Sequence, residues 1–76
     1  MWSIKIFSEL TTTELYAIYE LRVKTFVVEQ QRIYQEVDDT DLKAYHVFKT
    51  VNQNIIAYAR IFTEDDHLSF GRVVVD

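Results

Sequence analysis

Hydrophobic and polar residues alternate along several short segments of the chain, a pattern typical of β-strands with one buried face. Near the N-terminus, Trp2, Ile4 and Ile6 occupy every second position, which predicts a strand over residues 2–8. Three further strands are predicted, over residues 46–51, 55–62 and 68–75. The strand over 55–62 is apolar on both faces, so we expect it at the centre of the sheet.

A helix is predicted between the first two strands. Thr11 and Glu14 fit the S/T-x-x-E capping box, in which each side chain accepts a hydrogen bond from the other residue's backbone N–H, and the helix should reach about Gln30. At 100° per residue, one face carries Leu15, Ile18, Tyr19, Arg22, Phe26 and Glu29. We expect the core to form between this face and the sheet, from Leu15, Ile18, Phe26, Ile55 or Ile56, Ala57, and Val73 or Val74.

The segment over residues 31–45 has no period and is predicted to be a loop, with a short helical piece between Arg32 and Glu36. Asn52-Gln53-Asn54 supplies residues that tolerate positive φ and predicts a hairpin turn. The order of elements is therefore β-α-β-β-β. It predicts an α+β fold, an antiparallel sheet with the helix packed on one face.

Composition excludes several classes of protein. The net charge is −4 and the basic residues are scattered, which argues against nucleic-acid binding. The sequence has no apolar run long enough to span a membrane and no signal-peptide pattern. It contains no Cys and two His, so we expect no metal site and no disulfide. For a domain this small, the absence of disulfides favours a cytoplasmic location.

Four stretches, in this order, resemble the ElaA-like N-acetyltransferases of the GNAT superfamily. They are Glu14-Leu15-Tyr16 leading to Leu21-Arg22-x-x-x-Phe26-Val27-Val28-Glu29-Gln30, Tyr34-x-Glu36-x-Asp38-x-x-Asp41 before His46, Ala57-Tyr58-Ala59-Arg60, and Gly71-Arg72-Val73-Val74-Val75. The resemblance covers essentially all 76 residues. It implies the β-α-β-β-β first half of a GNAT fold and a family that transfers an acetyl group from acetyl-coenzyme A to an amine.

The resemblance implies a cofactor site that this sequence holds only in part. In the family, the fourth strand leads into an R/Q-x-x-G-x-G/A loop whose backbone N–H groups bind the pyrophosphate of coenzyme A. The only glycine here, Gly71, lies upstream of that position. We therefore expect residues 1–76 to be a partial domain, truncated before this loop, inactive alone and weak in binding acetyl-coenzyme A. Val73, Val74 and Val75 should pair with the pantetheine arm through their backbone.

The acceptor site implied by the resemblance comes from the first helix and the loop after it. Arg22 and Glu29 interrupt the apolar stripe, where they would face a substrate cleft or lie with their charged heads in solvent. The acidic segment over 36–41 would attract a cationic amine or be solvated, and Glu36 is our candidate general base, acting through water. Further substrate-binding candidates from these motifs are Phe26, Tyr34, Asp38 and Asp41.

Polar side chains on the predicted strands need partners or access to a cleft. In one strand pairing Arg60 and Arg72 share a face with Tyr58, where they would line the cleft or form buried ion pairs with nearby carboxylates. His46 has the near-neutral pKa that acid–base chemistry needs, although a lone His at a strand edge is more often structural. Arg60, Arg72 and His46 complete the substrate-binding candidates.

Two other interpretations compete with the acyltransferase. One is a non-enzymatic fragment or interaction domain that self-associates, and we expect a homo-oligomer through the fourth strand because Val73-Val74-Val75 has no visible cover. The other uses Leu21-Arg22-x-x-x-Phe26, which is also similar to acyl-homoserine-lactone synthases; the Gly71–Val75 stretch favours the ElaA-like family.

Overall fold

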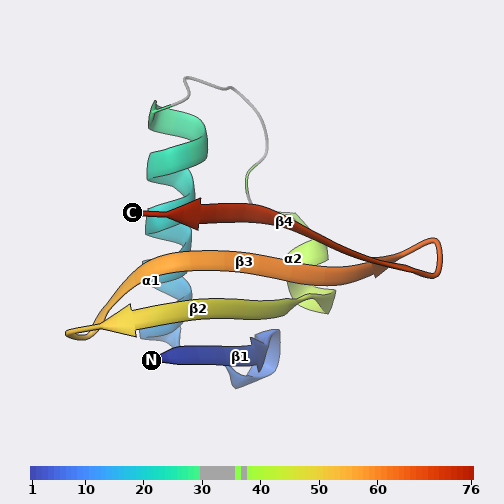
Figure 1. Cartoon of the computed structure of the whole chain (residues 1–76), viewed down its shortest axis with the longest axis horizontal. Coiled ribbons are helices and arrows are strands. Elements are labelled where there is room, and N and C mark those ends of the chain that lie inside the picture. Colours follow the sequence, from blue (N-terminus) through green and yellow to red (C-terminus); the bar gives the residue numbers. More distant parts are fainter. Residues whose placement is uncertain (30–35, 37) are drawn as a thin grey trace.

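The computed structural model describes residues 1–29, 36 and 38–76, and of Glu29 it describes the backbone (Figure 1). The elements are β1 (Trp2–Ile6), η1 (Phe7–Glu9), α1 (Thr12–Arg22), η2 (Val23–Glu29), α2 (Thr40–Lys43), β2 (Tyr45–Val51), β3 (Asn54–Glu64) and β4 (His67–Val75). They form a four-stranded antiparallel sheet with α1 behind it, so the predicted α+β class is confirmed.

The strand order β1-β2-β3-β4 places β3 between two neighbours, as its apolar sequence predicted. The turn before β3 has positive φ at Asn52 (50°) and Gln53 (68°), and the turn before β4 repeats this at Asp65 (50°) and Asp66 (63°). Two consecutive left-handed residues are the geometry of a tight hairpin turn, which Asn and Asp tolerate. The predicted turn at residues 52–54 is confirmed, and the second one allows β3 and β4 to run longer than predicted.

α1 begins with the predicted capping box. The Glu14 backbone N–H donates to Thr11 Oγ1 (3.0 Å) and the Thr11 N–H donates to Glu14 Oε1 (2.9 Å). The helix continues from Arg22 into η2, a π-helical segment that ends at Glu29. The predicted extent is thus nearly right, but the turn widens after Arg22. Gln30 and the predicted helical piece lie outside the described residues, apart from Glu36.

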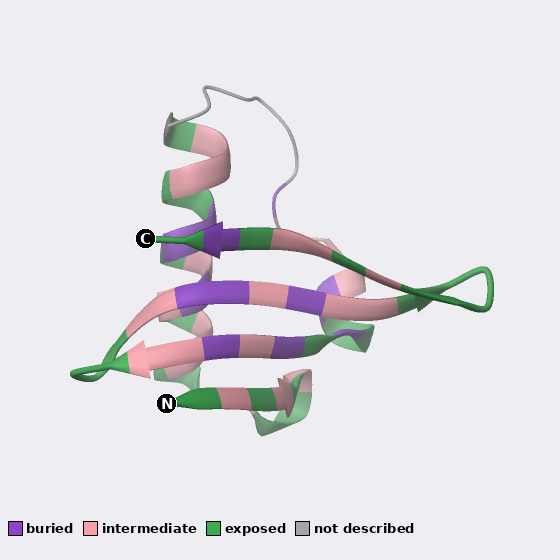
Figure 2. Cartoon of the chain, in the orientation of Figure 1, coloured by how far each residue is buried: buried purple, intermediate pink, exposed green. Residues whose placement is uncertain are grey.

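The core lies between α1 and the middle of the sheet, where the buried colouring of Figure 2 is concentrated. It consists of Ile18, Leu21, Phe48, Tyr58 and Val74, with Leu10, Tyr19, Phe26 and Ile55 packed against it. Ile18, Phe26, Ile55 and Val74 were predicted. Ala57 is buried but lies on the opposite side of β3 from Tyr58, so its predicted place between helix and sheet is wrong. Phe48, Tyr58 and Leu21 were not predicted.

Candidate functional site

Six charged side chains from five parts of the fold meet behind β3 and β4. Arg22 comes from the end of α1, Arg60 from β3 and Arg72 from β4. The carboxylates of Glu36 and Asp38 precede α2, and that of Asp41 lies within it. We call these six residues the arginine–carboxylate cluster. It balances three positive charges against three negative ones, which is the condition for burying charge at tolerable cost.

Arg22 is at the centre of the cluster and is fully buried. Its Nε donates to Glu36 Oε2 (2.8 Å), its Nη1 to Asp41 Oδ1 (2.9 Å) and its Nη2 to the Glu36 carbonyl (2.7 Å). The guanidinium carbon also lies 5.2 Å and 5.5 Å from the ring centroids of Tyr19 and Tyr58. This planar, multidentate role suits Arg and cannot be filled by Lys.

The two strand arginines complete the network. Arg60 Nη1 donates to Asp38 Oδ1 (2.8 Å) and to Asp41 Oδ1 (2.9 Å). Arg72 Nε donates to Glu36 Oε2 (2.7 Å), and its Nη2 lies 3.6 Å from Asp38 Oδ2. The segment that carries the three carboxylates is thereby fastened to α1, β3 and β4 at once.

The charges of the cluster shift the acidities of its members. The hydrogen bond from Arg60 lowers the pKa of Asp38. Burial by itself lowers the pKa of Arg22, but hydrogen bonds to Asp41 and Glu36 outweigh burial and raise it. In the described part of the chain, Asp41 Oδ2 and Arg60 Nε are buried without a hydrogen-bond partner. The cluster is therefore tightly paired around Arg22 and less well satisfied between Asp41 and Arg60.

A β-bulge sets the position of Arg72. Tyr58 pairs with Val74 and Arg60 with Gly71, so two residues of β4 lie opposite Ala59. Arg72 has φ of 51°, a left-handed conformation that costs a non-glycine residue about 1–2 kcal/mol. Gly71 beside it does not have positive φ. The contacts of Arg72 with Glu36 and Asp38 offset this strain, and bulges of this kind re-aim side chains near functional sites.

His46 fastens α2 to the sheet. Its Nε2 lies 2.8 Å from the Asp41 carbonyl, which can only accept, so Nε2 carries the proton. Nδ1 then accepts from the Tyr58 hydroxyl at 2.6 Å. His46 is fully buried, and burial lowers its pKa. Burial also raises the pKa of Tyr58, which keeps its hydroxyl proton for this bond.

Three comparisons place these features among known proteins. No family model matches the chain. It is 47% identical to the UPF0039 protein C11D3.02c of Schizosaccharomyces pombe over 74 residues, covering 95% of this chain and 49% of that protein. It is 42% identical to Protein ElaA of Escherichia coli over 79 residues, covering 97% of this chain and 52% of ElaA.

The solved structures agree. An acyl-CoA N-acyltransferase from Pseudomonas aeruginosa matches all of this chain with a TM-score of 0.92 and 38% identity, over 56% of that chain. Escherichia coli ElaA matches with the same TM-score and 40% identity, over 55% of its chain. The resemblance to ElaA-like N-acyltransferases is confirmed. The chain spans about half the length of the relatives it matches, as an ElaA-like N-terminal half would.

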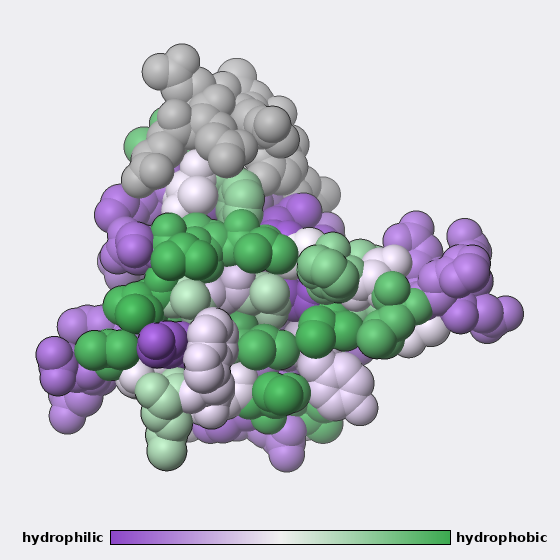
Figure 3. Space-filling model, in the orientation of Figure 1, coloured by the Kyte–Doolittle hydropathy of each residue, from purple (hydrophilic) through white to green (hydrophobic). Residues whose placement is uncertain are grey.

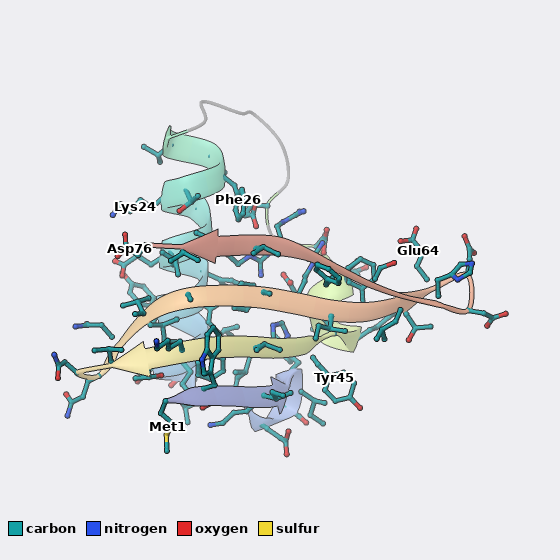
Figure 4. All side chains as sticks on the ribbon, viewed as in Figure 1. Met1, Lys24, Phe26, Tyr45, Glu64 and Asp76 are labelled. Carbon is teal, nitrogen blue, oxygen red and sulfur yellow. The ribbon has the colours of Figure 1, made fainter. Side chains whose placement is uncertain are left out.

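The structure brings most, but not all, of the predicted site residues together. The arginine–carboxylate cluster brings together six of the predicted site residues, and His46 binds its Asp41. Phe26 is half-buried in η2 against the core (Figure 4). Tyr34 lies outside the described residues, as does the side chain of Glu29. The sequence left cleft lining and buried ion pairs open for Arg60 and Arg72, and the described contacts are ion pairs.

The three valines predicted to bind the cofactor form the end of β4. Val74 faces the core, while Val73 and Val75 are exposed. Among the described strands β4 pairs with β3 alone. A groove of about 510 Å³ lies beside this end of β4, between α1 and the β2–β3 turn. Its rim carries Lys24 and Asp76, whose charged atoms are 3.5 Å apart (Figure 4).

Two further observations concern metal ions and membranes. Within residues 1–29, 36 and 38–76, no group of three or more His, Cys, Asp or Glu side chains is arranged to hold a metal ion. None of the described helices is both long enough and apolar enough to pass through a membrane.

Proposed function

We propose that this chain contributes the β4 and acceptor-side half of an N-acyltransferase site that moves the acetyl group of acetyl-coenzyme A to an amine. The observation that carries the proposal is the match of the whole chain, at a TM-score of 0.92 and 38% identity, to an acyl-CoA N-acyltransferase. The place of β4 at the edge of the described sheet supports it, because an extended pantetheine arm can add beside an edge strand as a further strand does.

In this proposal Val73, Val74 and Val75 bind the pantetheine arm through backbone N–H and C=O groups. The bulge at Arg72 sets the direction in which β4 continues through Val73, Val74 and Val75, and the arginine–carboxylate cluster keeps the bulge in place. The cluster also holds the segment over residues 36–41 beside β4. Acceptor binding is assigned to this segment and its neighbours. Contact with the acceptor is assigned to Phe26, Glu29, Tyr34, Asp38 and Arg72, and the buried Arg22, Asp41, His46 and Arg60 contribute by keeping the segment in place.

The proposed reaction is direct. The neutral amine attacks the thioester carbonyl, a C–N bond forms, the C–S bond breaks, and the thiolate of coenzyme A leaves. Glu36 is the proposed general base and receives the amine proton through a water molecule. One of its oxygens already accepts from Arg22 and Arg72, which fixes the carboxylate in position. The rate would come from holding the two substrates together and from backbone N–H groups near the carbonyl.

Amide NMR of the 76-residue chain, titrated with acetyl-coenzyme A up to millimolar concentration, tests this proposal. We expect weak binding that shifts the amides of Val73, Val74 and Val75 more than those of β1 at the other edge of the sheet. Equal shifts at both edges, or none at the highest concentration, would contradict it.

A second candidate is a self-associating interaction domain, and the same strand edge favours it. The outer edge of β4 can pair with the β4 of another copy, which is the homo-oligomer that the sequence predicted. The two uses of the edge exclude each other, so acetyl-coenzyme A should dissociate an oligomer paired through β4. We also propose a cytoplasmic location, because the sequence has no Cys.

A further inference from the structure

Another pocket lies between α2 and β3, and we call it the α2–β3 pocket. Its volume is about 430 Å³, within the range of about 300–1,000 Å³ that is usual for small-molecule sites. Its lining residues come from these two elements and are Thr40, Lys43, Arg60, Phe62, Thr63 and Glu64. Because β3 is an internal strand of the described sheet, the pocket is separate from the outer edge of β4.

The pocket lies on the same side of the sheet as the core. Along β3, Arg60, Phe62 and Glu64 follow Tyr58 at alternate positions, so they share the side on which Tyr58 packs against α1. The opposite face has a different character, since Figure 3 looks onto it and shows many apolar side chains over its strands. A ligand with charged groups is therefore better matched on the α2 side.

Arg60 brings an unsatisfied hydrogen-bond donor to the pocket lining. The residue is buried, with 5% of its surface exposed. Its Nη1 donates to Asp38 and Asp41 and its Nη2 to Asp38, whereas its Nε is buried without a hydrogen-bond partner among the described residues. Leaving a buried donor unsatisfied costs about 1–3 kcal/mol. A carboxylate oxygen bound in the pocket would supply the missing acceptor.

Two further charges of the lining are uncommitted. Lys43 comes from the last turn of α2 and Glu64 from the end of β3, and both are exposed. Neither takes part in an ion pair with another described residue. A simple anion in the pocket would be repelled by Glu64, and a simple cation would be repelled by Lys43 and Arg60. A group that carries both a carboxylate and an ammonium matches all three side chains.

The α2–β3 pocket adjoins the proposed acceptor site through Asp38. Its Oδ2 accepts from Arg60 Nη2 (3.3 Å) and lies 3.6 Å from Nη2 of Arg72, the residue in the bulge of β4. The Asp38 side chain is 33% exposed, against 4% for Glu36 and 1% for Asp41. Asp38 is therefore the carboxylate of the cluster that a ligand anchored in the pocket can reach.

We propose that the α2–β3 pocket binds the α-amino-acid group of the acceptor. The carboxylate of this group accepts from Lys43 Nζ and Arg60 Nε, and its ammonium donates to Glu64. The acceptor is then a free diamino acid, whose second amine extends past Asp38 toward the bulge and the thioester. Calling this ligand the acceptor rests on the proposed function, whereas the binding site itself does not.

Three probes test the pocket by NMR of the labelled chain at millimolar concentrations. L-ornithine has the amino-acid group and a second amine, L-norvaline lacks the second amine, and putrescine lacks the carboxylate. We expect ornithine and norvaline to shift the Arg60 Nε–Hε signal and the amides of Thr40 and Lys43, and putrescine to leave the Nε–Hε signal unchanged. Ornithine alone of the two amino acids should also shift Asp38. Equal shifts with all three probes, or none, would overturn the proposal.

Matched variants locate the binding site. Lys43→Met and Glu64→Gln should each raise the ornithine dissociation constant about three- to five-fold, as expected for the loss of one exposed charge pair. Lys49→Met is the control, because Lys49 lies on the other face with its ammonium 5.8 Å from the Trp2 ring centroid, and it should leave the constant unchanged. Circular dichroism checks that each variant is folded. Equal effects of Lys43→Met and Lys49→Met would contradict the pocket.

The same titrations separate this proposal from the proposed function. Norvaline binding at Arg60 in a chain whose Val73, Val74 and Val75 do not respond to acetyl-coenzyme A would support the pocket and contradict acyl transfer. A response of these valines to acetyl-coenzyme A, with no response of the Arg60 Nε–Hε signal to either amino acid, would overturn the pocket alone.

Discussion

Replacing Arg22 by Met should be among the most damaging single substitutions in this protein. The change preserves the apolar stem and removes a guanidinium that is fully buried and donates to Glu36 and Asp41. Both carboxylates would then lie in the interior with fewer partners. Breaking a buried ion pair from one side costs about 3–5 kcal/mol.

That loss is large on the scale of this fold. Domains have unfolding free energies of about 5–15 kcal/mol, and one of 76 residues belongs near the lower limit. Each kcal/mol corresponds to about 4–8 °C in Tm at this size. We therefore expect Arg22→Met to lower Tm by about 12 °C or more, or to unfold the chain at room temperature.

The assay is urea and thermal denaturation followed by circular dichroism, at a concentration where sedimentation shows one species. Lys5→Met is the matched control, because it removes a cation from a partly exposed pair with Glu14 (2.9 Å), which is worth at most about 1 kcal/mol. The stability of Arg22→Lys should lie between those of Arg22→Met and Lys5→Met, because one ammonium group cannot replace all the hydrogen bonds that the guanidinium donates. A melt of Arg22→Met within a few degrees of the parent would refute the reasoning.

Four further predictions follow from single contacts. Arg72→Gly should be more stable than Arg72→Ala by about 1–2 kcal/mol, because both lose the ion pairs and only Ala keeps the left-handed strain; equal denaturation midpoints would contradict the bulge. Phe48→Ala should cost about 3–5 kcal/mol and Phe26→Ala less, since Phe48 is buried and Phe26 half-buried; the reverse order by urea denaturation would contradict this core. Burial lowers the pKa of His46 in the folded protein below the unfolded value of about 6.5. The free energy of unfolding should therefore decrease as the pH falls below the unfolded pKa, and NMR should show that His46 titrates below the unfolded pKa. Calorimetry should show acetyl-coenzyme A binding more weakly than low micromolar, and a tighter constant would contradict the partial cofactor site.

Local sequence patterns predicted most of the fold. The capping box at Thr11 and Glu14, the Asn52–Asn54 turn and the strand alternation are short-range signals. The capping box and the turn formed where predicted, whereas the first strand, predicted over residues 2–8, ends at Ile6 because Phe7–Glu9 form η1. The change to π-helical turns after Arg22 has no such local signal in the sequence.

The candidate site was predictable as a set of residues but not as a geometry. Arg22 was a candidate site residue because it interrupts an apolar stripe, and Arg60 was one because it lies on a central strand. Their shared partner Asp41 is on α2, a four-residue helix with no periodic pattern. The bulge at Arg72 has no local signal, because a left-handed backbone is typical of Gly, and here Arg72 adopts it while the neighbouring Gly71 does not.

The central claim, that the end of β4 receives the pantetheine arm, is tested most directly by isotope-filtered NMR of the labelled chain with unlabelled acetyl-coenzyme A. The account predicts nuclear Overhauser contacts between the pantetheine methylene protons and the backbone amides of Val73, Val74 and Val75. Contacts confined to β1, to the face of the sheet opposite α1 or to the outer side of α1 would contradict it.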